Sequence, residues 1–252
     1  RSIWVTGVQT CALPISTWFS LLLLPLSWLF RLVVAARRIA YRIGLLSSIR
    51  VARPVVVIGN ITVGGTGKTP FTIWLADQLL RKHKRVGIVL RGFGGRSDHW
   101  PRDVDQDSAP QEVGDEAVLL AKRTAAIVVA GPDRVAAARR AIERGAEVVL
   151  SDDGLQHYRL ARDREIVVID GCRGVGNRRM LPAGPLREPV SRLAQADLRV
   201  VSWRDGSTRP LTPVPATIQA CARLTQAVAL IGGETIWRSE ERRVGKEGRS
   251  RW

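Results

Sequence analysis

VVVIGNITVGGTGKT, residues Val55 to Thr69, is the stretch that decides the fold. A short apolar run ends in a glycine-rich turn that closes on Gly67-Lys68-Thr69, and an amphipathic segment follows from Pro70 to Leu80. Glycines let backbone N–H groups turn toward a polyphosphate, and the following helix offers the positive end of its dipole. The lysine of such a loop reaches the β- and γ-phosphates, and the hydroxyl after it can bind magnesium. The stretch therefore predicts a phosphate-binding loop.

The loop departs from the template G-x-x-x-x-G-K-[ST] at its first position, which is Thr62, although Gly64 and Gly65 supply flexibility nearby. The alternative is a glycine-rich turn that binds nothing. A strand before the turn and a helix after it favour nucleotide binding, because they are the context that the motif requires. The predicted nucleotide-binding residues are Thr62, Val63, Gly64, Gly65, Thr66, Gly67, Lys68 and Thr69.

The composition describes a folded and strongly basic chain. Its 252 residues are 45% hydrophobic, which excludes disorder throughout, and the net charge is +16. Such a charge indicates a phosphate-rich partner or an anionic surface. The arginines are scattered and no nucleic-acid motif stands out, so we expect no nucleic-acid binding. The three cysteines show no metal-site spacing and are interpreted as free thiols, and no protein partner is predicted.

An uncharged segment, TWFSLLLLPLSWLF, runs from Thr17 to Phe30 with Trp18 and Trp28 near its ends. An apolar body, aromatic anchors and the basic flank that follows favour a helix held in or on a membrane. A helix buried in the globular core is the alternative, because the uncharged run is shorter than the roughly 20 residues that cross a bilayer. The flanking arginines are Arg31, Arg37, Arg38, Arg42 and Arg50.

Strands and helices then alternate. Helical patterns cover Pro70 to Leu80, Asp115 to Arg123, and Asp133 to Arg144, with Asp133 as the expected N-cap. Strands that are apolar on both faces and separated by helices predict an α/β fold, a mostly parallel sheet covered on both sides as in phosphate-loop NTPases. The expected strands are Val55 to Ile58, Val86 to Leu90, Ala126 to Ala130, Val148 to Leu150, Ile166 to Ile169 and Leu198 to Ser202, with Thr217 to Leu224 and Ala227 to Ile231 as two more.

The domain boundaries follow from these patterns. Residues 1–16 and 239–252 show no sustained period and resemble translated adapter sequence, so we expect them to lie outside the fold. Residues 17–50 form the membrane-associated helix with its basic flank, and residues 51–205 form the phosphate-loop core. Residues 206–238 are interpreted as a connector and the start of a truncated second domain.

Polar residues follow several of the expected strands. Asp152 and Asp153 come directly after the run VVL, where phosphate-loop enzymes place a magnesium-binding aspartate. Asp115 and Glu116 open a helix, where they either stabilise its dipole or lie close to the γ-phosphate. Arg91 and Arg96 flank the glycines of RGFGG and suit a phosphate or a sugar. Arg91, Arg96 and Glu116 are candidates for substrate binding.

VVIGNITVGGTGKTP, RGFGG, VGDE, LSDDGLQHYRLARD and LPAGPLREP together resemble the tetraacyldisaccharide 4'-kinase family, the lipid A 4'-kinases of Gram-negative bacteria. The resemblance covers about Trp18 to Gly233. It implies an enzyme that uses ATP and Mg²⁺ to phosphorylate the 4'-hydroxyl of a tetraacylated glucosamine disaccharide phosphate. It also implies a location at the cytoplasmic face of the inner membrane, with the amino-terminal helix against the membrane surface and the acyl chains of this glycolipid.

The resemblance also implies roles for single residues. Asp115 is the expected general base, and Lys68, Arg134 and Arg187 are the expected catalytic cations. Gln156 is assigned to the nucleotide. Thr69, Asp152, Asp153 and Glu188 are assigned to the metal.

Two departures from the family pattern accompany the resemblance. Arg179 stands where relatives carry glycine in a GNGR sequence, and the later histidine-containing motif does not appear. We therefore expect this chain to bind nucleotide better than it turns over lipid. The alternative class is a nucleotide switch or partitioning ATPase, which is disfavoured because Val63 stands where many of those proteins carry a signature lysine.

Overall fold

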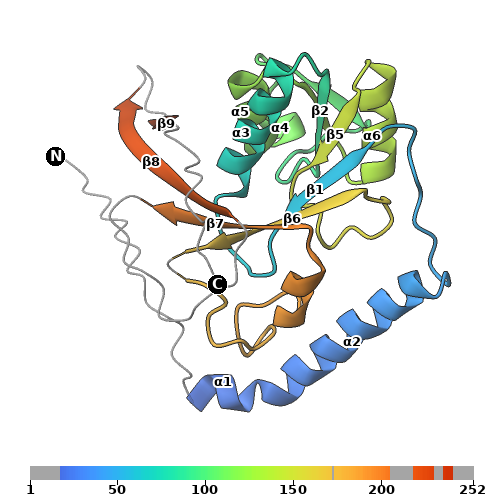
Figure 1. The fold of residues 1–252 in the computed structure, drawn as a ribbon, viewed down its shortest axis with the longest axis vertical. Helices are drawn as coiled ribbons and strands as arrows, with labels where there is room; N and C mark the ends of the chain where they lie inside the picture. Colours follow the sequence, from blue (N-terminus) through green and yellow to red (C-terminus); the bar gives the residue numbers. More distant parts are fainter. Residues whose placement is uncertain (1–17, 172, 205–217, 230–234, 241–252) are drawn as a thin grey trace, which may run out of the picture.

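A twisted, nine-stranded sheet forms the centre of the computed structural model, which describes residues 18–171, 173–204, 218–229 and 235–240 (Figure 1). The strand order is β3-β4-β2-β5-β1-β6-β7-β8-β9. Every pairing from β4 to β8 is parallel, and only the edge strands β3 and β9 pair antiparallel. The predicted mostly parallel sheet is confirmed. The strands are β1 Val55–Gly59, β2 Val86–Leu90, β3 Arg102–Val104, β4 Ile127–Ala130, β5 Val148–Ser151, β6 Arg164–Asp170, β7 Leu198–Arg204, β8 Ile218–Ala229 and β9 Thr235–Glu240.

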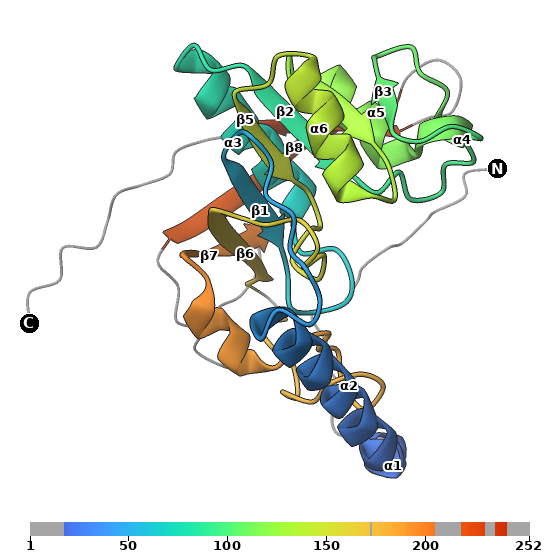
Figure 2. The same ribbon diagram turned by 90° about the vertical axis from the view of Figure 1, so that its right-hand side faces the viewer.

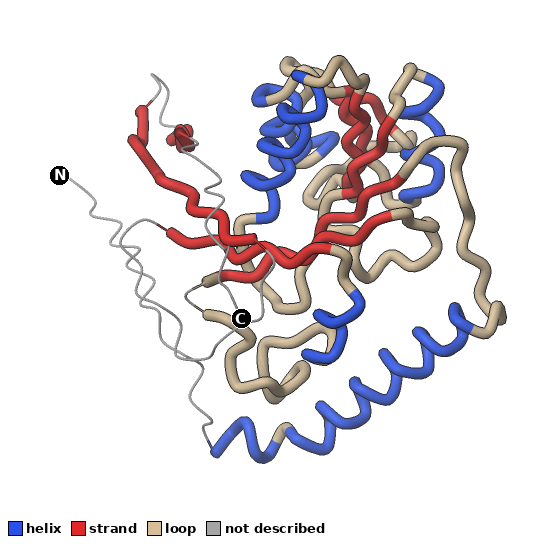
Figure 3. Tube along the Cα trace, in the orientation of Figure 1, coloured by secondary structure: helices blue, strands red, loops and turns tan. Residues whose placement is uncertain are grey.

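Helices cover both faces of this sheet because the strands are apolar on both faces. In β1, Ile58 packs with Phe71 of α3 and Leu120 of α5 on one face. Val57 packs with Ala138 of α6 on the other. Figure 3 shows this layering of strands between helices. The helices are α1 Trp18–Leu22, α2 Leu24–Arg42, α3 Lys68–Arg81, α4 Pro110–Val113, α5 Asp115–Arg123, α6 Arg134–Glu143 and the 3-10 helix η1 Val190–Gln195.

The capping prediction for α6 is confirmed. The Asp133 carboxylate accepts hydrogen bonds from the backbone N–H groups of Val135 (2.9 Å) and Ala136 (3.4 Å). These two bonds satisfy N–H groups that a helix start otherwise leaves without a partner. They fix where α6 begins, and with it the position of Arg134.

The prediction of two separate strands after residue 216 is wrong. One strand, β8, covers the described residues of both expected segments, and β9 pairs back against it. The pairing register shifts between Leu224 and Gln226, so a bulge absorbs the polar interruption that the sequence suggested as a break. The end of β9 includes Ser239 and Glu240, two residues of the segment expected to lie outside the fold. Residues 1–17, 205–217, 230–234 and 241–252 lie outside the described residues.

The long helix α2 lies along one side of the molecule, next to η1 (Figure 2). Phe30 and Val34 pack on the buried cluster around Leu186, and the Ser27 hydroxyl donates to the Met180 carbonyl (2.8 Å). Ser27 is nevertheless the one buried residue of α2, so the alternative of a core helix is wrong. Among the described residues, no helix has both the length and the hydropathy to cross a membrane.

The loop before LPAGPLREP contains a strained residue. Arg178 has φ 61°, in the left-handed region, and it is residue 178, not Arg179, that occupies the glycine-like backbone position. A Cβ atom in this region costs about 1–2 kcal/mol.

We expect Arg178→Gly to raise the free energy of unfolding by about 0.5–1 kcal/mol, because relief of strain exceeds the added entropy of the unfolded chain. Urea denaturation measures the change. Arg178→Ala is the matched control, since it removes the same charge but keeps the Cβ atom. An equal effect of both variants would contradict the strain interpretation.

Candidate active site

The phosphate loop joins β1 to α3. Gly67, just before the first residue of α3, has φ 80°, and a Cβ atom there would lie 2.5 Å from the Ser202 hydroxyl oxygen. Both the backbone angle and the close neighbour require glycine at this position. Lys68 then begins the helix, and its side chain is only 11% exposed. The loop has the local shape that the sequence predicted.

Asp152 and Asp153 lie beside the loop because β5, which precedes them, pairs with β1. The Lys68 ammonium is 3.5 Å from the Asp153 carboxylate, and the Arg187 guanidinium is 3.4 Å from its other oxygen. Asp153 thus pairs with two cations. Asp152 is 1% exposed and lies behind it.

The Asp152 carboxylate is satisfied on one side only. Its Oδ1 accepts hydrogen bonds from the Thr72 hydroxyl (3.1 Å) and the Asp153 N–H (3.0 Å). Its Oδ2 is buried and has no hydrogen-bond partner among the described residues. A buried oxygen without a partner is unusual in a native structure. This oxygen is therefore suited to bind a cation.

The pKa of Asp152 is raised to about 7, first by burial and then by the nearby Glu116 carboxylate, against the lowering effect of Lys68. The group therefore holds a proton up to near-neutral pH. A divalent cation at Oδ2 would compete with that proton, so its binding lowers the pKa.

Carboxyl ¹³C NMR should show one aspartate that titrates near pH 7, because burial disfavours its charged form. Asp152→Asn should remove that signal and identify it. Added Mg²⁺ with a nucleotide should move the midpoint to lower pH. If all aspartates titrated below about pH 5, near their ordinary pKa, the assigned environment of Asp152 would be wrong.

The amino end of α5 brings a further carboxylate, that of Glu116, to the loop. The Thr69 hydroxyl donates to Glu116 Oε1 (2.5 Å), and Asp115 lies next to it with an exposed side chain. Gly114, at φ 91°, allows this approach, since a Cβ atom there would collide with the Phe93 carbonyl oxygen. The RGFGG loop and the VGDE turn therefore pack directly against each other.

The two arginines of the RGFGG loop are more peripheral. Arg91 and Arg96 are exposed, and Arg96 is fixed through its backbone N–H, which donates to the Gln111 carbonyl (2.8 Å). Neither side chain forms a hydrogen bond or ion pair with the phosphate loop within the described part of the chain. Their assignment to substrate remains a prediction.

Arg134 holds the turn at Asp152 in place through backbone hydrogen bonds. It is 4% exposed, and its guanidinium donates to the backbone carbonyls of Gly131 (3.3 Å) and Asp152 (3.1 Å). Burial lowers its pKa to about 10, so it stays charged at neutral pH. The Gln156 amide donates to the Asn60 carbonyl (3.0 Å) and fastens DDGLQH to the loop.

LPAGPLREP lies against the phosphate loop. The Val63 N–H donates to the Pro185 carbonyl (2.8 Å), and the Arg187 N–H donates to the Ile61 carbonyl (2.7 Å). Thr62 forms an antiparallel bridge with Leu186. These contacts explain how a proline-rich segment far along the chain places Arg187 beside Asp153.

Glu188 has different partners from the other residues assigned to the metal. It is 1% exposed, and its Oε1 accepts a hydrogen bond from the Tyr158 hydroxyl (2.6 Å). Its Oε2 lies 4.0 Å from Arg38 of α2 and 3.8 Å from Arg192 of η1. The structure thus brings together Lys68, Thr69, Glu116, Asp152, Asp153 and Arg187, and places the Glu188 carboxylate in a neighbouring network.

Sequence reasoning missed four residues of this region: Thr72, Tyr158, Arg38 and Arg192. Thr72 lies one helical turn after Lys68, so helical spacing alone could have identified it. The other three depend on contacts between distant segments and left no local signal.

The chemistry of the donors fits a magnesium ion bound with a nucleotide. The described residues contain no group of three or more His, Cys, Asp or Glu side chains suited to a metal. Mg²⁺ in nucleotide sites is held by one or two protein ligands together with phosphate oxygens and water. The Thr69 hydroxyl and Asp152 Oδ2 match that requirement.

Comparisons with known proteins agree with this architecture. The sequence model of the tetraacyldisaccharide-1-P 4'-kinase family matches residues 19–242. The tetraacyldisaccharide 4'-kinase of Alkalilimnicola ehrlichii is 55% identical over 78% of this chain and 58% of its own length. That of Nitrosococcus oceani is 56% identical over 72% of this chain and 54% of its own length.

A solved structure of LpxK from Aquifex aeolicus in complex with ATP is also similar, with a TM-score of 0.67 and 32% identity. The match covers 81% of this chain and 64% of that one. The chain thus spans a little over half the length of the curated relatives it matches. The chain belongs to the tetraacyldisaccharide-1-phosphate 4'-kinase family.

Proposed function

We propose that the complete protein transfers the γ-phosphate of ATP to the 4'-hydroxyl of a tetraacyldisaccharide 1-phosphate in lipid A biosynthesis. The proposal rests on one observation: the loop lysine, the paired aspartates and the Glu116 carboxylate of α5 converge at the carboxyl ends of β1 and β5. This edge is where open α/β sheets bind their ligands. The names of the relatives and the ATP complex of the Aquifex protein support the choice of substrates.

The protein's residues would act mainly by position and charge, since phosphoryl transfer needs little covalent chemistry from the enzyme. Lys68 and Arg187 would bind the phosphates, and exposed Asp115 would accept the proton of the attacking hydroxyl. Thr69 and Asp152 would hold Mg²⁺, which neutralises phosphate charge when bound. Arg134 would act as a positioning residue, because its donors hold the Asp152 turn.

The test of the proposal is an assay of the complete protein with γ-³²P-ATP and the tetraacyldisaccharide 1-phosphate in detergent micelles. The expected product carries the label at the 4'-position. ATP hydrolysis without labelled lipid would contradict the kinase assignment and favour the nucleotide-switch class.

The membrane surface is the partner that we propose for α2. Its exposed apolar side chains include Leu26, Leu29 and Val33, which recur at helical spacing on one face. Arginines lie on the same helix, as they do in helices that lie in the membrane interface. This arrangement supports a location at the cytoplasmic face of the inner membrane.

The double variant Leu29→Glu/Val33→Glu should bind vesicles of phosphatidylcholine and phosphatidylglycerol at least about tenfold more weakly, because each buried apolar side chain contributes roughly 1.5–3 kcal/mol. Co-sedimentation measures the binding. Leu119→Glu, at an exposed leucine of α5, is the matched control. Unchanged sedimentation of the double variant would argue against α2 as the membrane contact.

A further inference from the structure

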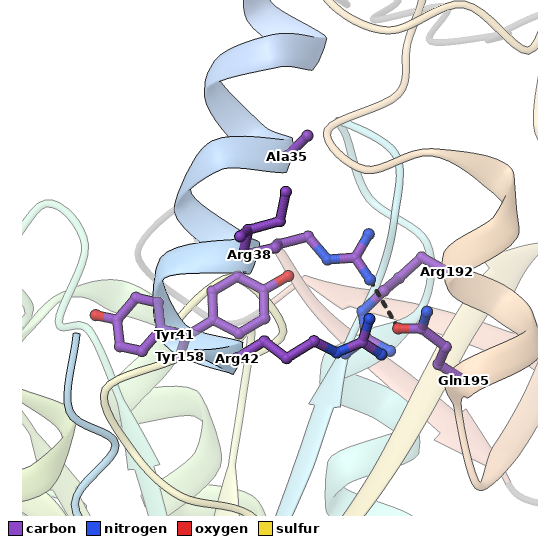
Figure 4. Close-up of a pocket in the computed structure, with 8 residues that line it drawn as sticks. Ala35, Arg38, Tyr41, Arg42, Tyr158, Arg192 and Gln195 are labelled. Atoms are coloured by element: carbon purple, nitrogen blue, oxygen red, sulfur yellow. Dashed lines mark hydrogen bonds between the residues drawn. The ribbon is translucent and has the colours of Figure 1, made fainter. Parts of the chain in front are cut away.

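A cavity of about 420 Å³ lies between the second half of α2 and η1 (Figure 4). Its volume falls within the ~300–1,000 Å³ range of small-molecule sites. Arg38, Tyr41 and Arg42 line it from α2, Arg192 and Gln195 line it from η1, and Tyr158 completes the wall. The described contacts of the phosphate loop account for none of these side chains.

Positive charge dominates the surroundings of the cavity. Arg38, Arg42 and Arg192 line it, and Arg37 and Arg162 lie over the Tyr158 ring at 5.9 and 5.1 Å from its centroid. Two carboxylates oppose these five cations: Glu188, near Arg38 and Arg192, and Glu165, which pairs with Arg192 and Arg162. The balance favours an anionic ligand.

The guanidinium groups that line the cavity are only partly paired with protein acceptors. Arg192 is 4% exposed, and its Nε–H makes no hydrogen bond among the described residues, although Nε lies 3.8 Å from the Glu188 Oε2 oxygen. Arg42 forms no hydrogen bond or ion pair within the described part of the chain. Arg38 donates one hydrogen bond to the Gln195 side-chain oxygen (2.7 Å). The Arg42 guanidinium is therefore available to an anionic ligand, and phosphate oxygens match guanidinium geometry.

An apolar row on α2 leads into the cavity. Trp28, Leu32, Ala35 and Ile39 follow one another at spacings of four, three and four residues, so they lie along one side of the helix. Trp28, Leu32 and Ile39 are exposed, and Ala35 and Ile39 line the cavity. A ligand with both hydrocarbon chains and a phosphate group would fit this combination of surfaces.

The geometry points to a site for the phosphate that the acceptor lipid already carries, at the end of the disaccharide away from the reacting hydroxyl. This assignment rests on the proposed function. It is favoured over the headgroup of a bulk phospholipid because adjacent residues serve the two sites: Arg187 pairs with Asp153, and Glu188 contacts the cavity arginines. The cavity would then help to fix the orientation of the disaccharide.

The test compares the complete wild-type protein with Arg42→Gln and Arg38→Gln in kinase assays on two acceptors, the 1-phosphate and its 1-hydroxyl counterpart. Arg31→Gln is the matched control, because it removes the same charge from α2 outside the cavity lining. Loss of one charged hydrogen bond corresponds to roughly a tenfold to hundredfold effect. We expect both cavity variants to raise KM about tenfold or more for the phosphorylated acceptor, with little change for the hydroxyl acceptor or in KM for ATP.

A parallel arm measures binding of the same proteins to phosphatidylcholine vesicles with and without phosphatidic acid. Arg42→Gln could weaken only the part of vesicle binding that depends on phosphatidic acid and leave the KM difference between the two acceptors intact. That result would overturn the assignment to the acceptor in favour of a bulk headgroup. Equal behaviour of Arg42→Gln and Arg31→Gln in both arms would overturn the phosphate site altogether. A wild-type protein that labels neither acceptor would refute the proposed function instead, while the vesicle arm would still report on the cavity.

Discussion

Lys68→Ala in the complete protein should reduce kcat/KM for ATP by roughly 10²–10³ or more, the usual cost of removing one preorganised charge from a transition state. The Lys68 ammonium is largely buried at the start of α3 and faces Asp153 at 3.5 Å. No other lysine side chain is placed at this edge in the described contacts. Alanine would leave the transferred phosphate without its nearest cation.

Steady-state kinetics with saturating acceptor measures this effect. Lys82→Ala is the matched control, because Lys82 caps the other end of the same helix and is exposed. It should leave kcat/KM unchanged. A Lys68→Ala enzyme within about threefold of wild type, far smaller than the expected loss of one preorganised charge, would show that the loop lysine does not bind the reacting phosphate.

Asp115→Asn should lower kcat by about 10²–10⁴ while ATP affinity stays near that of wild type, since general-base catalysis contributes this much and the amide cannot accept the proton. Asp115 is exposed at the first turn of α5, next to the Glu116–Thr69 hydrogen bond. It can therefore reach a hydroxyl that approaches from solvent.

Single-turnover assays together with nucleotide titration separate transfer from binding. The control is Asp107→Asn, which removes an exposed carboxylate from the loop before α4. Near-normal transfer by Asp115→Asn would mean that the alternative from the sequence, stabilisation of the helix dipole, is the whole role of Asp115.

Much of the fold could be predicted because its determinants are local. The apolar strand β2 and the amphipathic helix α5 have the predicted bounds, and Asp133 caps α6 as expected. The order in which the strands pair could not be predicted in this way. Nothing local indicates that β5 lies between β1 and β2, or that a bulge carries β8 through Leu224 and Gln226.

The same distinction applies to the site. The loop residues Gly67, Lys68 and Thr69 form a contiguous motif, so their chemistry could be predicted from spacing. The hydrogen bond from Thr72 to Asp152 joins residues 80 positions apart, and the bond from Arg38 to Gln195 joins residues 157 apart. Such contacts exist only once the sheet order and the position of α2 are set.

The proposed mechanism requires the turn at Lys68 to hold the triphosphate beside Asp115. A crystal structure of the complete protein with Mg²⁺ and a non-hydrolysable ATP analogue tests it most directly. We expect the γ-phosphate within hydrogen-bond distance of the Lys68 ammonium, with the metal on the Thr69 hydroxyl and Asp152. A nucleotide bound elsewhere, with Lys68 still paired only to Asp153, would contradict it.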